Sequence, residues 1–170
     1  MQRAFKYLKG LEWRERIQTE CIFCDRTNFG NIVYEDEEVI AIDTIRPAGQ
    51  FHWLILPKDH AVRDVESLTG QHFALLEAMD RAKKQVVEEL CPGLPPAAVL
   101  SGYHRGRRPL LGDIFWPDII SIHHLHLHVI VRPHWLPWLF KYPPWLPLMW
   151  KSDASVMQQA IVTSTPTEVT

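Results

Sequence analysis

The stretch SIHHLHLHVIV, residues 121–131, constrains this chain most strongly, because four histidines fall within six consecutive positions. His124, His126 and His128 alternate with leucine and valine, so a strand would carry three imidazoles on one face and apolar side chains on the other. A half-exposed strand needs only generic polar residues at such positions. A row of imidazoles on a rigid element therefore indicates either metal binding or a histidine that acts as nucleophile or general acid.

Length and charge limit the class of protein. The chain has 170 residues and a net charge of −2, with a pI near 6.5, which suits one domain with enough chain to bury a core. This balance gives no reason to expect capture of nucleic acid or of an acidic membrane surface, although HRGRRP at 104–109 is a local basic cluster. Three cysteines do not make a disulfide scaffold and suit a reducing compartment, so we expect a cytoplasmic or nuclear protein.

Hydrophobic periodicity predicts an α+β fold, in which an antiparallel sheet of about five strands carries one long helix across it. The helix is expected from Thr69, as N-cap, to Leu90, with Cys91-Pro92-Gly93 ending it. The expected strands lie within 31–34, 39–45, 51–57, 97–103 and 121–131, and a short helix is expected at 154–162. In this division, residues 1–20 form a helical extension, 21–150 form the domain with a loop insertion at 105–120, and 151–170 form the short helix and a frayed tail.

The most apolar segment, residues 134–150, contains four prolines that would break a membrane-spanning helix. We expect a packed, irregular segment there and no membrane partner. The first 20 residues lack the long apolar core of a secretory signal and are expected to form an amphipathic helix.

HLHLHVI, from His124 to Ile130, resembles the H-φ-H-φ-H-φ-φ signature (φ apolar) of the histidine triad superfamily of nucleotide hydrolases and transferases. CIFC, VYEDEEVIAI and IRPAGQFHWLILPKDH fall in register and look like the Hint type, so that the resemblance runs from about residue 21 to 162. The chain is most similar to the third Hint branch, of adenosine 5'-monophosphoramidases. GYH at 102–104 and FHWLILP also look like aprataxin, which removes AMP from DNA ends.

This resemblance implies a purine nucleoside phosphoramidate hydrolase, of the AMP-lysine or aminoacyl-adenylate type, that works through a nucleotidyl-histidine intermediate. His126 would be the nucleophile, with its ring oriented by a hydrogen bond to the backbone carbonyl of His124. His128 would donate to the phosphate oxygens, and Ser121 would assist departure of the leaving group. The alternatives are aprataxin-like deadenylation of nucleic-acid ends and a nucleotide-binding scaffold with weakened activity.

The same resemblance implies a nucleotide pocket. His52 would border the phosphate, and Ile42, Ile45 and Phe23 match the purine slot. The ribose-binding aspartate of the family falls on Thr44, with Asp43 one position earlier, and a one-residue step in a strand turns the side chain to the other face. Both residues are therefore candidates for the ribose hydroxyls.

Metal binding is a second chemistry that the sequence leaves open. Cys21 and Cys24 form half of a zinc site, and relatives complete it with residues that correspond here to His60 and His124. The alternative is a pair of thiols that simply pack. Catalysis would need no cofactor, and the relatives imply a homodimer formed through the long helix and the adjacent strand. Nucleic acid is not expected as a partner, and the apolar run within loop 105–120 is expected to pack over the triad.

Overall fold

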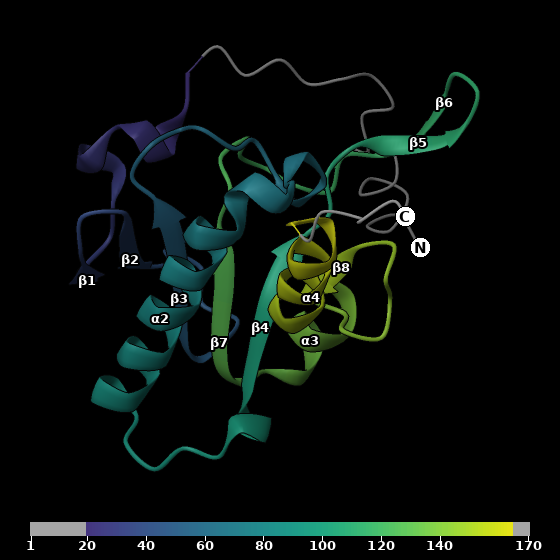
Figure 1. The fold of residues 1–170 in the computed structure, drawn as a ribbon. Coiled ribbons are helices and arrows are strands. Elements are labelled where there is room, and N and C mark those ends of the chain that lie inside the picture. Colours follow the sequence, from purple (N-terminus) through teal and green to yellow (C-terminus); the bar gives the residue numbers. More distant parts are fainter. Residues whose placement is uncertain (1–19, 165–170) are drawn as a thin grey trace.

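The computed structural model describes residues 20–164, so all but the last residue of the helical extension expected over 1–20, and the tail from 165, lie outside the described residues. Its main sheet has six antiparallel strands in the order β1-β2-β3-β7-β4-β8 (Figure 1). Their bounds are β1 Ile32–Glu35, β2 Val39–Asp43, β3 Gly49–Pro57, β4 Val99–His104, β7 Leu127–Pro133 and β8 Trp150–Ser152. The predicted α+β class is confirmed.

Helices lie on one side of this sheet and in the connections. The long helix α2 (Phe73–Leu90) crosses the sheet, and α4 (Asp153–Ser164) packs beside it (Figure 1). Both agree with the predicted helices to within a few residues, and α2 follows directly on a 3-10 turn that begins after Thr69. The short helices are α3 Trp135–Phe140 and the 3-10 turns η1 Ile22–Cys24, η2 Arg26–Asn28, η3 Val65–Ser67, η4 Gly70–His72 and η5 Pro96–Ala98.

Strand alternation separates two apolar layers. The face under α2, here the helix face, buries side chains such as Trp53, Ile55 and Val129 against Met79 and Val86 of the helix. The opposite face carries His52 and His128, and we call it the histidine face. A second cluster extends over the histidine face, formed by Phe23, Ile40, Ile42, Leu54 and Leu56. Most of the inner strands are therefore buried on both faces, as their long apolar runs require.

The central strand is shorter at its start than the sequence predicts. Strand β7 begins at Leu127, so the expected strand over 121–126 is wrong. The backbone N–H of Leu125 donates to the carbonyl of Val62 at 2.9 Å, so this segment bonds to the stretch after β3 instead of extending the ladder of β7. Only His128 of the three alternating histidines therefore lies within regular strand.

The insertion at 105–120 forms a separate two-stranded hairpin of β5 (Arg108–Leu111) and β6 (Ile114–Trp116), which projects from the body of the molecule (Figure 1). Its tip leaves Leu111 75% exposed. The expectation that the apolar run packs over the triad is therefore wrong for the tip. A two-residue turn at Gly112 and Asp113 closes the hairpin, with Gly112 at a positive φ of 52° that favours glycine.

Strand β8 and helix α3 are two further elements that the sequence did not predict. Strand β8 pairs with β4 through Gly102↔Ser152 and occupies the outer edge of that strand. A strand of a second copy therefore cannot pair with residues 102–104 of β4 on this side. Among the described residues, no helix has the length and apolar character needed to cross a membrane.

Candidate active site

The imidazole of His126 is held by the backbone two residues earlier. Its Nδ1 lies 2.7 Å from the carbonyl oxygen of His124, so Nδ1 carries the proton and donates it. This hydrogen bond is the one that the family resemblance implies. The lone pair is therefore on Nε2, and the ring of Phe23 packs edge-on against this imidazole with centroids 5.5 Å apart. The backbone geometry thus orients His126 with Nε2 as its nucleophilic atom.

A chain of donors fixes the tautomer of His128. The backbone N–H of Ala48 donates to Nδ1 of His52 at 3.3 Å, so the proton of His52 is on Nε2. That Nε2 lies 3.0 Å from Nδ1 of His128 and donates to it. The proton of His128 is therefore on Nε2, which is buried and has no hydrogen-bond partner within residues 20–164. An unpaired buried N–H is unfavourable unless a ligand oxygen accepts it.

His104 completes the group of imidazoles and was not among the residues that the sequence singled out as functional. It ends β4, its ring centroid lies 4.8 Å from that of His128, and its Nε2 donates to the carbonyl of Lys141 at 2.8 Å. Tyr142 stacks on His104 and also contacts His52 and His128 edge-on, so it closes this side of the site. The available signal was the GYH motif at 102–104.

All of these imidazoles are neutral near pH 7. Burial, as the largest cause, lowers the pKa of His52 to about 3 and the pKa values of His104 and His126 to about 4. Burial, with the neighbouring histidines as a second cause, also holds the pKa of His128 well below its usual range. A neutral imidazole has the free lone pair that a nucleophile needs.

The residues expected in the nucleotide pocket are only partly brought together. Phe23 and Ile42 share the buried cluster on the histidine face, but Ile45 lies beyond the end of β2 and is 85% exposed. The structure therefore does not place Ile45 in that cluster. The backbone N–H of Thr44 donates to the carbonyl of His52 at 3.1 Å, and alternation puts Thr44 on the histidine face and Asp43 on the helix face.

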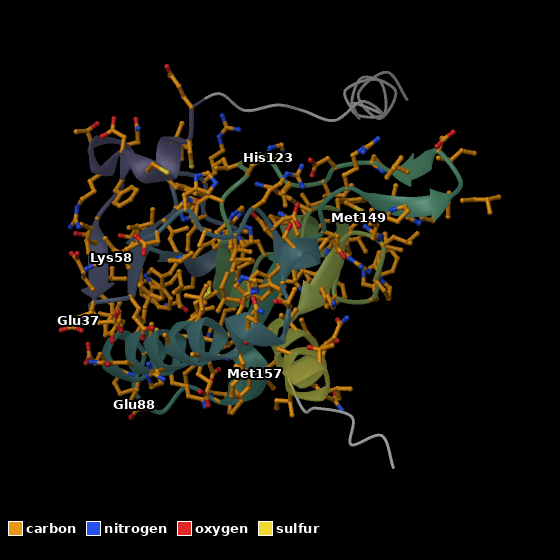
Figure 2. The ribbon with its side chains drawn as sticks, turned by 45° about the horizontal axis from the view of Figure 1, so that its top comes forward. Glu37, Lys58, Glu88, His123, Met149 and Met157 are labelled. Atoms are coloured by element: carbon orange, nitrogen blue, oxygen red, sulfur yellow. The ribbon has the colours of Figure 1, made fainter. Side chains whose placement is uncertain are left out.

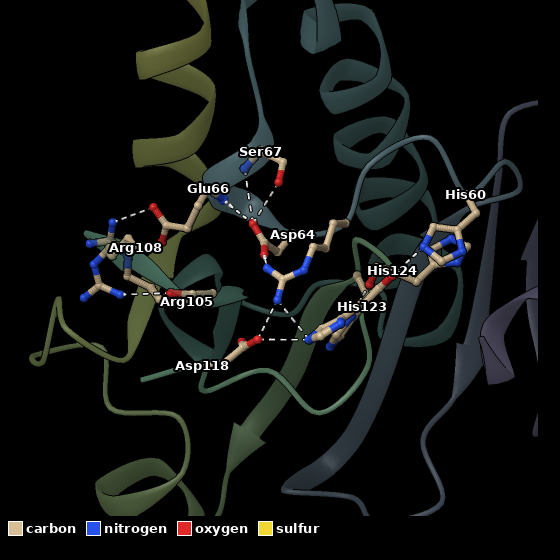
Figure 3. Close-up of polar contacts among 12 residues, drawn as sticks. His60, Asp64, Glu66, Ser67, Arg105, Arg108, Asp118, His123 and His124 are labelled. Carbon is tan, nitrogen blue, oxygen red and sulfur yellow. Dashed lines mark hydrogen bonds and ion pairs between the residues drawn. The ribbon is translucent and has the colours of Figure 1, made fainter. Parts of the chain in front are cut away.

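Ser121 lies exposed at the end of the hairpin connection, five residues before His126. A polar network holds this connection in place (Figure 3). The guanidinium of Arg63 pairs with Asp64 and, at 2.6 Å, with Asp118, whose carboxylate also lies 2.9 Å from Nε2 of His123. Ile120 is buried in the crevice that His104 and His126 line. The root of the hairpin, unlike its tip, therefore borders the site.

The four expected metal ligands lie together at the other side of His126. One ligand atom from each of Cys21, Cys24, His60 and His124 lies within 4.8 Å of the others. Nδ1 of His124 is 3.5 Å from Sγ of Cys21, and Nδ1 of His60 is 3.2 Å from Sγ of Cys24. A tetrahedral zinc ion with bonds of about 2.0–2.3 Å would separate its ligand atoms by roughly 3.3–3.8 Å. The residues present therefore fit a zinc ion.

The backbone prepares both histidines of this cluster as ligands. Nε2 of His124 donates to the carbonyl of Pro57 at 2.9 Å, and Nε2 of His60 donates to the carbonyl of His123. In each ring the proton is on Nε2 and the lone pair of Nδ1 faces the thiols (Figure 3 shows the two rings side by side). Fixing the tautomer through the second ring nitrogen is the usual support of a metal-bound histidine.

Comparisons with known proteins identify similar chains. The family model described as "Scavenger mRNA decapping enzyme C-term binding" matches residues 18–141. Aprataxin of Danio rerio is 32% identical over 113 residues, which cover 66% of this chain and 30% of that protein. Adenosine 5'-monophosphoramidase HINT3 of Xenopus tropicalis is 27% identical, with 71% of this chain and 72% of that protein covered.

A solved structure gives the same fold. The HIT family hydrolase from Clostridium thermocellum has a TM-score of 0.51 and 29% identity, and the match covers 68% of this chain and 92% of that one. The chain spans less than a third of the length of the aprataxin that it matches.

Proposed function

The chain belongs to the histidine triad superfamily, and from this premise we propose that it hydrolyses purine nucleoside phosphoramidates through a nucleotidyl-histidine intermediate. The observation that carries the proposal is that two neighbouring imidazoles hold their Nε2 atoms in opposite protonation states. Nε2 of His126 is unprotonated and carries an oriented lone pair. Nε2 of His128 is protonated, and this buried donor has no partner among residues 20–164. Their ring centroids lie 4.9 Å apart, which suits one phosphorus and its oxygens.

The proposed reaction has two displacements. In the first, Nε2 of His126 bonds to the α-phosphorus and the bond from phosphorus to the amine nitrogen breaks, with the hydroxyl of Ser121 giving its proton to the amine. In the second, water adds its hydroxyl to phosphorus, the bond to Nε2 breaks, and the remaining proton of the water restores Ser121. His126 becomes cationic in the intermediate, and the carbonyl of His124 stabilises that charge through the Nδ1–H.

His128 is proposed to act on the developing negative charge. Its Nε2–H would donate to a non-bridging phosphate oxygen, and a single donor of this kind contributes about 3 kcal/mol to transition-state stabilisation. Phe23 and Ile42 would contact the purine, and Thr44 would face the ribose. The proposed zinc site would be structural, since its four protein ligands leave no position for substrate.

The test is turnover of a fluorogenic adenosine phosphoramidate by the wild type and by His126→Ala. The variant should lose at least about 1000-fold in turnover and keep its affinity for AMP, because it lacks the nucleophile but keeps the base pocket. Mass spectrometry after a quench without acid should find AMP on His126. Activity of the variant within tenfold of wild type, or AMP on His128 instead, would exclude this route.

A second candidate is deadenylation of nucleic-acid ends, which the 32% identity to aprataxin favours. It differs from the first in its leaving group and not in its nucleophile. An adenylated oligonucleotide, compared with adenosine phosphoramidate at equal concentration, separates the two. A wild-type chain that binds AMP and turns over neither substrate would instead be the nucleotide-binding scaffold.

A further inference from the structure

Aromatic and aliphatic side chains gather, unusually exposed, on α3 and the segment after it. Trp135 and Phe140 of α3 are 68% and 67% exposed, and Trp145 is 55% exposed. The full set, which we call the tryptophan surface, is Ile45, Trp135, Leu136, Trp138, Phe140, Trp145 and Leu148. Exposed apolar side chains gathered in this way mark a site of association in a folded protein. None of these seven side chains is among those proposed to contact the nucleotide, although Ile45 directly follows Thr44 in the chain, so the surface requires a separate explanation.

The members of this surface come from segments that the backbone ties together. The N–H of His134, just before α3, donates to the carbonyl of Ala48 at 2.8 Å, which places the loop of Ile45 beside the start of the helix. The segment after α3 is fixed by the N–H of Tyr142, which donates to the carbonyl of Pro137 at 2.8 Å. Arg108 donates to the carbonyl of Leu148 at 2.9 Å. The surface is therefore a fixed part of the fold.

The charged side chains within the segment that carries most of this surface have one sign. No aspartate or glutamate occurs from residue 119 to 152, whereas Arg132, Lys141 and Lys151 do. The positive charge of Arg46 lowers the pKa of Lys141, second to burial, which shows that these two cations lie near one another. Glu37 and Glu88 lie toward the opposite side of the molecule from Met149 (Figure 2). Glu66 also lies near this segment, where it forms an ion pair with Arg105, which donates to the carbonyl of Pro147. The net charge of −2 thus conceals an excess of cations in the segment that carries the tryptophans.

We infer that the tryptophan surface docks on a bilayer that contains anionic lipids. Surfaces that lie in a membrane interface typically combine tryptophan, phenylalanine and leucine with a few cationic side chains. Indole rings prefer the headgroup level, where the ring is in an apolar region and its N–H stays hydrated. A nucleic-acid surface would instead need a groove with more cations than these. This inference reverses the sequence-based expectation of no membrane partner, which rested on the averaged charge and on spanning helices.

Docking would have a consequence for the histidine site, although the inference does not depend on the proposed function. Tyr142 follows α3 by two residues and contacts His52, His104 and His128, and the carbonyl of Lys141 accepts from His104. Helix α3, which would lie on the lipid, is thus directly followed by the residues that close one side of the histidine site. In a membrane-bound chain, that side of the site would lie at a fixed distance from the membrane.

The test is co-sedimentation of the full chain with vesicles of phosphatidylcholine alone and with vesicles that also contain phosphatidylserine. Wild type should bind the mixed vesicles at least about tenfold more tightly, and added salt should reduce that difference. The double variant Trp135→Ser with Phe140→Ser should lose at least about tenfold in binding, because both side chains are exposed and leave the core intact. Brominated lipids should quench wild-type tryptophan fluorescence more than that of the double variant.

Leu111→Ser is the matched control, since Leu111 is even more exposed, at 75%, but lies on the hairpin tip. Its vesicle binding should stay within about twofold of wild type, and circular dichroism should show that all variants fold. Absence of binding to the mixed vesicles, or equal binding by the double variant, would overturn the inference. So would a dimer, measured by light scattering, that the double variant dissociates, because the surface would then fit a second copy. Selective loss of oligonucleotide binding in the double variant, with vesicle binding intact, would also overturn it.

Discussion

Nε2 of His52 lies 3.0 Å from Nδ1 of His128, and this contact decides which nitrogen of His128 carries a proton. The N–H of Ala48 makes Nδ1 of His52 an acceptor, so the donor must be Nε2 of His52. His128 therefore presents its own Nε2–H away from His52. A backbone amide thus controls the tautomer of a proposed oxyanion donor through one intervening imidazole.

His52→Leu should lower kcat for the adenosine phosphoramidate by about 10- to 100-fold with little change in KM. The reason is that His128 can then place its proton on Nδ1, where no phosphate oxygen accepts it. His52→Gln can still donate an N–H and should recover part of the loss. Stopped-flow and steady-state measurements on both variants check this prediction. A rise in KM alone would show that His52 contacts the substrate directly.

Purified chain should contain about one zinc ion, and a strong chelator should lower its melting temperature. Cys24→Ser removes one thiolate of the four ligands and should lose the metal. Cys91→Ser is the control, because Cys91 lies outside the cluster. Elemental analysis and thermal melts under reducing conditions give both readouts. A metal-free wild type with chelator-independent melting would leave Cys21 and Cys24 as packing residues.

Several parts of this site could be predicted because they depend on local patterns. Alternation and apolar runs indicate the strands, and the spacing of Cys21 and Cys24 indicates half of a metal site. The hydrogen bond of His126 to His124 is implied by the family resemblance, and it spans only two residues, so it depends on few other parts of the fold.

Contacts between distant segments could not be predicted in the same way. Strand β8 has only three residues, and it is a strand because it pairs with the edge of β4. No local pattern in Trp150–Ser152 predicts that pairing. Strand β7 starts late because Val62, far away in sequence, binds Leu125. His104 lies in the site because β4 pairs with β7. Ile45 lies outside it because β2 ends at Asp43.

Removing the hairpin should leave the chain folded. The N–H of Ile119 donates to the carbonyl of Arg105 at 3.1 Å, so a short glycine-rich link can join Gly106 to Pro117 without stretching. Arg105 would keep its ion pair with Glu66 at 2.6 Å. Because the tip projects away from the histidines, turnover of small and bulky phosphoramidates should change by the same factor, within about threefold. A selective gain on bulky substrates would show that the hairpin restricts access after all.

The free energy of unfolding should fall as pH decreases from about 6.5 toward 5. Burial lowers the pKa values of His104 and His126 to about 4 in the folded chain, whereas unfolded histidine titrates near 6.5. Between these values the unfolded chain binds more protons, so acid favours unfolding, and each histidine contributes up to about 1.4 kcal/mol per pH unit. This pH range lies above the pKa values of ordinary carboxylates, so the change in stability within it comes mainly from the histidines.

Urea titrations of the chelator-treated chain at about pH 7.5, 6.5, 5.5 and 5 would measure how the free energy of unfolding changes with pH. These pH values lie on both sides of the pKa of unfolded histidine, which is about 6.5. His104→Gln removes one buried titrating group but can still donate to the carbonyl of Lys141. Its slope should be smaller than that of wild type by up to about 1.4 kcal/mol per pH unit, even if the variant is less stable at every pH. Stability that is flat over this range would mean that the histidines of the folded site titrate as they do in the unfolded chain.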